Sequence, residues 1–201
     1  MKGFADTADD DRPGIDEIDD VIDADAVSDD EDDFDDDYPE DATDEEIDLV
    51  VGLYREDGLP VATALPKALA NDLDELADHL RRYPADGGCV ALVSIADEFF
   101  VICRVRGKHV QVLLSDALSA NDWPIAHDVV DYLGLEIPEA DDDSYPVGDL
   151  DLLSDLGVGD FDLEAIATNY DDDSTVLAAE IADRLKFGPQ YGRVVSASFG
   201  L

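Results

Sequence analysis

The segment GCVALVSIADEFFVICRVRGKHVQVLLSD, residues 88–116, gives the strongest indication of the fold. It contains three apolar runs, separated by a short break at Asp97 and another at Gly107 and Lys108. Apolar runs of this length, rich in β-branched and aromatic residues and bounded by turn residues, are typical of buried β-strands. Breaks as short as these connect strands that run antiparallel. The stretch therefore predicts a meander of three antiparallel strands.

The turn of the second hairpin determines its register. With residues 107–108 in the turn, three apolar pairs share one face: Val105 faces Val110, Cys103 faces Val112 and Val101 faces Leu114. The opposite face carries Arg104, Arg106, His109 and Gln111. Side chains alternate between the two faces of a strand, so the two sets lie on opposite sides of the sheet. We expect the first face to be buried and the second to be exposed.

The segment before the meander predicts a hairpin followed by a helix. IDLVVGLY (47–54) and LPVATALP (59–66) are strand-like runs joined by a short turn that contains a glycine. The segment NDLDELADHLRRYP (71–84) then shows apolar residues at helical spacing. We expect Asn71 or Asp72 to cap this helix at its N-terminus.

The segment after the meander predicts more helices. NDWPIAHDVVDYLGL (121–135) is expected to be a helix, with Asp122 as its N-cap and Gly134 at its C-terminal end. The following loop, EIPEADDDSYP (136–146), is acidic. Short helical segments are expected beyond this loop. The last residues, 189–201, are expected to form a loose tail or a docked strand.

Together these segments predict an α+β fold with the order ββαβββα. The hairpin and the meander are expected to join into one five-stranded, mainly antiparallel sheet, with helices on at least one face and small C-terminal helices. This order matches a profilin-like or longin-like sandwich. We expect a disordered acidic tail at 1–46 and a sheet domain at 47–134. Residues 135–201 should form an acidic loop and a C-terminal helical extension packed on the same domain.

The charge of the chain restricts its partners. The chain carries 53 acidic and 12 basic residues, and its formal net charge is −41. Such a charge repels nucleic acid and anionic lipid, and it attracts basic proteins. The chain has no apolar run long enough to cross a membrane, and its first residues lack the apolar core of a signal peptide. We therefore expect a cytoplasmic protein with a basic protein partner, and no direct binding to nucleic acid or membranes.

About half of the net charge lies in the N-terminal tail. Residues 1–46 hold 23 acidic and 2 basic residues, a charge density typical of disordered segments. Phe34 and Tyr38 interrupt the acidic run, as aromatic side chains do in binding segments. Two interpretations remain open: a tail that only keeps the chain in solution, or a polyanionic lure for a basic partner.

Residues that carry catalysis or hold metals follow none of the patterns that such sites require. The sequence has no phosphate-binding glycine loop, no GxSxG elbow and no HExxH. The aspartate runs lack the spacing of a calcium loop, and the cysteines lack a CxxC spacing. We expect no catalytic residue, cofactor or metal site, and surface roles for His79, His109 and His127. Cys89 and Cys103 are expected to be buried and reduced, with a disulfide as the alternative.

A basic cluster stands out in this acidic chain. It consists of Arg104, Arg106, Lys108 and His109. The cluster could grip a phosphate or an acidic surface of a partner. It is also explained by an exposed sheet face, or by an internal clamp on the protein's own acidic segments. The sequence leaves these interpretations open.

Four stretches in combination resemble a known family: ALPKALANDLDELADHL (64–80), LVSIADEFFVICRVRG (92–107), VLLSDALSANDWPIA (112–126) and PVGDLDLLSDLG (146–157). Residues 47–190 are similar to the actinobacterial tRNA adenosine deaminase-associated proteins. The resemblance implies a link to the enzyme that makes inosine at the wobble position of the tRNA anticodon, and it supplies no catalytic residues. The chain itself lacks the H-x-E and P-C-x-x-C motifs of a zinc deaminase.

Three hypotheses follow. The first is a non-catalytic partner or regulator of the deaminase in wobble-inosine formation that binds a basic protein surface. Its expected contact residues are Asp141, Asp142, Asp143, Tyr145, Phe34 and Tyr38. The second is an accessory module that contacts tRNA through Arg104, Arg106 and Lys108, although the net charge opposes it. The third is a small-molecule-binding or enzymatic α+β domain of unknown reaction.

Overall fold

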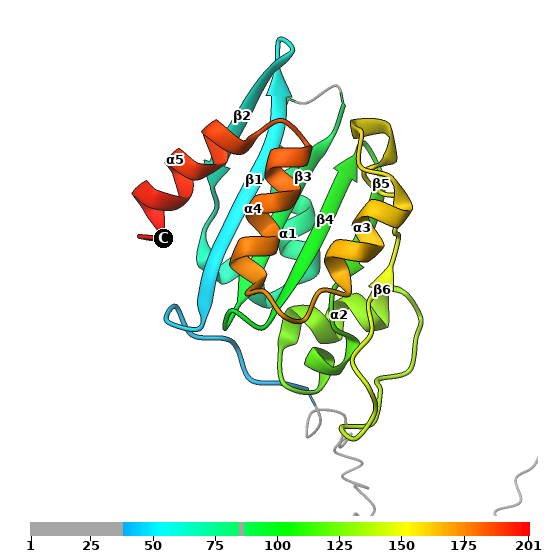
Figure 1. Cartoon of the computed structure of the whole chain (residues 1–201). Coiled ribbons are helices and arrows are strands. Elements are labelled where there is room, and N and C mark those ends of the chain that lie inside the picture. The colour runs from blue at the N-terminus through cyan, green and yellow to red at the C-terminus, as the bar shows by residue number, and fades with distance from the viewer. Residues whose placement is uncertain (1–37, 85–86) are drawn as a thin grey trace, which may run out of the picture. The chain divides into compact units, whose positions relative to one another are not determined.

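The computed structural model describes residues 38–84 and 87–201 (Figure 1). Its centre is a six-stranded sheet with the strand order β2-β1-β3-β4-β5-β6, in which every neighbouring pair runs antiparallel. The strands are β1 (Ile47–Glu56), β2 (Leu59–Ala64), β3 (Cys89–Ile95), β4 (Phe99–Arg106), β5 (His109–Leu114) and β6 (Val147–Gly148). The helices are α1 (Leu73–Leu80), α2 (Pro124–Tyr132), α3 (Asp160–Ala167), α4 (Ser174–Arg184) and α5 (Gly188–Ser198). The predicted α+β class with an antiparallel sheet is confirmed.

The sheet has six strands, whereas five were predicted. The additional strand, β6, has two residues and pairs Gly148 with Leu113 of β5. A β-carbon at Gly148 would lie only 2.2 Å from the Val112 carbonyl oxygen, so a glycine permits this close approach. Two residues are too few to show the alternation that reveals a strand in a sequence. The likeness to a profilin-like or longin-like sandwich stays a prediction.

The register predicted for the β4–β5 hairpin is confirmed. The three expected pairs are present: Val105 with Val110, Cys103 with Val112, and Val101 with Leu114. The turn between β3 and β4 also lies where it was predicted, with Ala96 and Asp97 both at a φ angle of 56°. Apolar alternation and turn position were therefore sufficient to place these strands.

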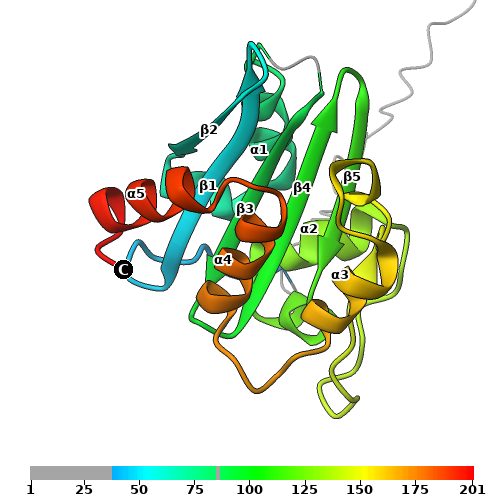
Figure 2. The same cartoon turned by 45° about the horizontal axis from the view of Figure 1, so that its top comes forward.

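Helices cover both faces of the sheet (Figure 2). α1 and α2 pack on one face, where their buried residues Leu76 and Val129 share a core with Cys103. α3 and α4 pack on the other face, where Ile181 shares a second core with Ile102. α5 lies along the β1–β2 side of the sheet. Alternate residues of β1, β3, β4 and β5 thus contribute to two separate apolar cores.

One predicted helix cap and the predicted form of the C-terminal segment are wrong. α2 begins at Pro124, and its N-cap is Trp123 rather than Asp122. The C-terminal segment is neither a loose tail nor a strand, because residues 188–198 form helix α5. Of the two predicted caps of α1, Asn71 and Asp72, the structure shows Asp72: its carboxylate accepts a hydrogen bond from the Glu75 amide at 2.8 Å.

Residues 38–46 lie against the folded part of the chain. Ala42 is buried, and its N–H donates to Oδ1 of Asn71 at 2.8 Å. The Asn71 side-chain amide donates back to the Ala42 carbonyl at 3.0 Å. The Lys67 ammonium donates to the Asp44 carbonyl at 2.5 Å and also to the Ile47 carbonyl. Phe34, with the rest of residues 1–37, lies outside the described part of the chain.

Candidate functional site

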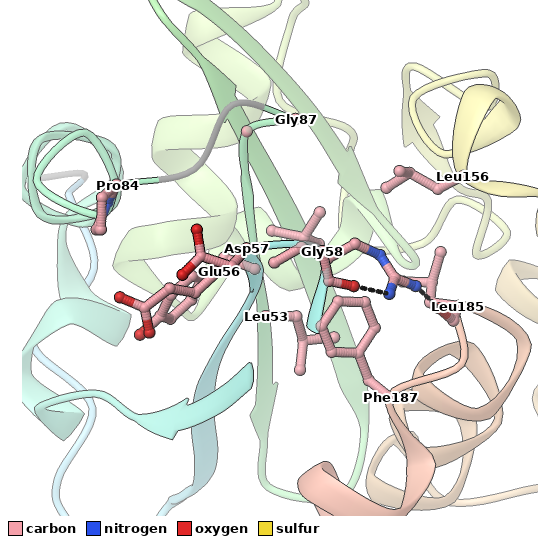
Figure 3. A pocket seen from close by; sticks show the side chains of 13 residues that line it. Leu53, Glu56, Asp57, Gly58, Pro84, Gly87, Leu156, Leu185 and Phe187 are labelled. Carbon is pink, nitrogen blue, oxygen red and sulfur yellow. Dashed lines mark hydrogen bonds between the residues drawn. The ribbon is translucent and has the colours of Figure 1, made fainter. Parts of the chain in front are cut away.

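A hollow of about 670 Å³ lies beside the N-terminal end of β3, where the neighbouring strand β1 extends further than β3 (Figure 3). β3 begins at Cys89, and its pairing with β1 ends where Val90 meets Leu53. β1 nevertheless continues to Glu56, so the β1–β2 hairpin projects beyond β3 and forms one wall. We call this hollow the hairpin pocket. Its other walls come from Gly87 and Gly88, from Leu156, and from the α4–α5 turn at Leu185 and Phe187.

Arg55 ties two walls of the hairpin pocket together. Its Nη1 donates to the Gly58 carbonyl at 3.4 Å, and its Nη2 donates to the Leu185 carbonyl at 3.3 Å. The guanidinium carbon also lies 5.0 Å from the centre of the Phe187 ring, which is a cation–π contact. Beneath these groups the floor is apolar and buried, formed by Leu53, Val90, Leu185 and Phe187.

The lack of a side chain at Gly88 allows the start of β3 to approach β4 closely. The φ angle of Gly88 is +86°, and a β-carbon there would lie 2.6 Å from the Val105 carbonyl oxygen. Gly88→Ala is therefore expected to lower the free energy of unfolding by about 2 kcal/mol, measured by urea denaturation. The matched control is Gly87→Ala, because a β-carbon at Gly87 would meet nothing within 4 Å. Equal losses in the two variants would contradict this account of Gly88.

The basic cluster is divided between an internal clamp and the surface. Arg104 is only 2% exposed, so the expectation that its face of the sheet is exposed is wrong at this residue. Its Nη2 donates to Asp155 at 2.8 Å and to the Gly87 carbonyl at 3.3 Å, and its Nη1 donates to Asp155 and to the Leu152 carbonyl. Arg106 is half exposed and reaches the same Asp155 carboxylate at 3.3 Å. The guanidinium groups lower the pKa of Asp155, chiefly through the hydrogen bonds from Arg104.

Lys108 and His109 remain at the surface, in the β4–β5 turn and at the start of β5. Of the three interpretations of the basic cluster, the internal clamp on an acidic segment describes Arg104. The segment around Asp155 folds over the face of β4 that carries Arg104, and this contact buries the arginine.

The acidic loop at 136–146 and the aspartate run at 171–173 lie side by side. Asp141, Asp142, Asp143 and Tyr145 are all exposed. The Tyr170 hydroxyl donates to the Ser144 carbonyl at 3.2 Å, and the Ser144 hydroxyl donates to Asp116 at 3.0 Å. The exposed Asp171, Asp172 and Asp173 follow Tyr170 directly. We call this surface the acidic patch: Asp116, Asp141–Asp143, Tyr145, Tyr170 and Asp171–Asp173.

The charge of the acidic patch affects Tyr170. The pKa of its phenol is raised, first by burial and then by the nearby carboxylate of Asp116. Tyr170 nevertheless remains 54% exposed, and Tyr145 is 44% exposed. The acidic patch therefore presents two aromatic side chains among its carboxylates.

Tyr38 lies on α2. Its hydroxyl donates to Asp128 at 2.8 Å, and its ring centre lies 4.9 Å from that of His127. The phenol pKa is raised by burial and by its hydrogen bond to Asp128. The side chain keeps 46% exposure and remains accessible beside α2.

The described residues form no group suited to a metal ion, and both of their thiols are buried. Within residues 38–84 and 87–201, no three His, Cys, Asp or Glu side chains are grouped so that they could hold a metal ion. Cys89 and Cys103 are free and buried, and burial raises the pKa of each thiol to about 12. None of the helices in the described part has the length and apolar character needed to cross a membrane.

Several residues of these sites could not be identified from the sequence. Arg55 and Phe187 lie more than a hundred positions apart, and no sequence signal joins them at the hairpin pocket. The aspartate run at 171–173 was visible as a run, but its position beside the acidic loop depends on the contact between Tyr170 and Ser144. Asp155 gave no signal beyond its charge.

Comparisons with known proteins agree on one family. A family model described as "Rv3753c-like tRNA adenosine deaminase-associated protein" matches residues 48–188. Protein Rv3753c of Mycobacterium tuberculosis (strain ATCC 25618 / H37Rv) is 36% identical over 149 residues, which cover 72% of this chain and 86% of that protein. No solved structure matches the chain.

Proposed function

Because the chain belongs to the Rv3753c-like tRNA adenosine deaminase-associated family, we propose that it is a non-catalytic protein that binds a tRNA adenosine deaminase directly. The contact is electrostatic, between the acidic patch and a basic surface of the enzyme. In this role the protein acts as a partner or regulator in wobble-inosine formation.

The observation that carries the proposal is the acidic patch. A surface that binds tRNA must be basic, because it neutralises phosphates. An acidic patch on a protein with a net charge of −41 is attracted to such a surface by the same force. Tyr145 and Tyr170 add the aromatic contact area that protein interfaces favour. The protein would thus occupy the surface that tRNA otherwise occupies.

The test is a binding experiment with competition. The full chain is immobilised and exposed to the purified deaminase of the same organism at low ionic strength. We expect the deaminase to be retained, and to be released both by added salt and by added tRNA. Release by salt but not by tRNA would refute the shared surface, and absence of retention would refute direct binding.

The tRNA-contacting alternative receives less support. Arg104 was expected to reach tRNA, but its guanidinium is buried, and its Nη1 and Nη2 groups donate to Asp155, Leu152 and Gly87. Arg106 shares Asp155, which leaves Lys108 as the freely projecting cation of the three. Single exposed cations contribute little against a strongly acidic protein.

A further inference from the structure

The hairpin pocket has the dimensions of a binding site. Its volume of about 670 Å³ falls within the range typical of ligand sites, and its floor is formed by buried apolar side chains. Leu156 is half-buried at one wall and the Phe187 ring lies beneath. A hollow of this kind gains most from an apolar group that displaces water from the floor.

The net charge at its rim is negative, because Glu56 and Asp57 outweigh the single positive charge of Arg55. Arg55 is exposed, and its guanidinium is held by the Gly58 and Leu185 carbonyls and by the Phe187 ring. Glu56 and Asp57 are exposed, and none of the ion pairs formed among the described residues involves either of them. Figure 3 shows their carboxylates on the Pro84 side of the pocket. The rim therefore complements a cation.

We propose that the hairpin pocket receives an apolar side chain from a basic protein segment, and that Glu56 and Asp57 bind the Lys or Arg residues flanking that side chain. The pocket thus adds a second contact surface, with its own sequence preference, to the electrostatic contact of the acidic patch. The inference rests on the proposed function only in taking the partner to be a basic protein. Nucleic acid is a poorer occupant, because its phosphates would meet both rim carboxylates.

The contacts that hold the pocket walls in place also favour binding of an apolar anchor. Arg55 hydrogen-bonds to the β1–β2 turn at Gly58 and to the α4–α5 turn at Leu185, and the start of β3 is paired with β1. A pocket whose walls are held in place loses less entropy when it binds a ligand. A single buried anchor surrounded by polar groups is the arrangement that gives specificity in protein interfaces.

The experiment uses the isotope-labelled full chain and three blocked pentapeptides. They are Lys-Lys-Phe-Lys-Lys, Lys-Lys-Ser-Lys-Lys and Glu-Glu-Phe-Glu-Glu, titrated at an ionic strength of about 0.15 M so that loose charge contacts are screened. Methyl chemical shifts of Leu53, Val90, Leu156 and Leu185 report on the pocket. We expect the Lys–Phe peptide to shift these methyls with at least fivefold higher affinity than either other peptide. Equal effects of the Phe and Ser peptides, or preference for the Glu peptide, would overturn the proposal.

Variants separate the two parts of the site. Leu156→Trp should fill the pocket and abolish the shifts, whereas Val176→Trp, at an exposed apolar residue near the start of α4, should leave them unchanged. The exposed double variant Glu56→Gln/Asp57→Asn should weaken the Lys–Phe peptide at least threefold, and it decides the matter if Leu156→Trp does not fold. Unchanged affinity in that double variant would overturn the cation contact. No deaminase is used, so this result is independent of deaminase binding.

Discussion

Replacing Arg104 with alanine is expected to lower the free energy of unfolding by about 3–4 kcal/mol. The guanidinium is buried and holds the Leu152 and Gly87 carbonyls together with Asp155. Its loss leaves a cavity, and the buried Leu152 carbonyl no longer accepts a hydrogen bond from Arg104. Urea denaturation followed by circular dichroism measures the change.

Arg106→Ala is the matched control for this variant. Arg106 binds the same Asp155 carboxylate, but its side chain is 50% exposed. An exposed ion pair contributes about 0–1 kcal/mol, so the loss should be small. Similar losses in the Arg104 and Arg106 variants would show that burial of Arg104 does not matter and would contradict the clamp.

The clamp also predicts a dependence on pH. The pKa of Asp155 is lowered in the folded protein, so the folded state favours the ionised carboxylate. Its stabilising contribution is present above the ordinary aspartate pKa of about 4, and is lost as the pH falls through the lowered value. Asp155→Asn should therefore be less stable than the wild type at pH 7, and the gap should narrow below about pH 4. A gap that is constant down to pH 2 would contradict this role.

Neutralising the acidic loop is expected to weaken binding to the deaminase about tenfold at physiological ionic strength. The variant is Asp141→Asn/Asp142→Asn/Asp143→Asn, which removes three exposed charges next to Tyr145. The affinity should fall because long-range attraction and direct ion pairs are lost together. Surface plasmon resonance at several salt concentrations measures both the affinity and its salt dependence.

A control with the same change in net charge separates the patch from the overall field. Glu45→Gln/Asp74→Asn/Asp160→Asn removes three exposed charges from scattered positions outside the acidic patch. It should reduce the affinity by less than threefold. If both triple variants weaken binding equally, the net charge of the chain accounts for the attraction and the acidic patch has no special role.

The central strands could be predicted because their signals are local. Residues 88–116 contain apolar runs broken by turn residues, and both features depend only on near neighbours in the chain. The register of β4 with β5 followed from the position of one turn. The Asp72 cap likewise depends on an amide only three residues away. These features do not require knowledge of the tertiary fold.

The features that the sequence did not predict depend on tertiary contacts. Arg104 was expected at the surface because nothing near it in sequence shows that the segment around Asp155 covers it. Helix α5 contains Gly188, Pro189 and Gly192, which are poor helix formers. It forms because Tyr191 and Val195, one turn apart, are buried against the sheet and α4. The acidic patch combines two aspartate runs whose proximity no local signal reveals.

Direct binding of the protein to the deaminase can be measured by isothermal titration calorimetry of the full chain with the purified deaminase of the same organism. At an ionic strength of about 0.15 M, direct association predicts a saturable binding isotherm whose affinity falls as salt is added. Prior saturation of the deaminase with tRNA should suppress this binding. A titration without binding heat at two temperatures, with both proteins folded, would contradict direct association.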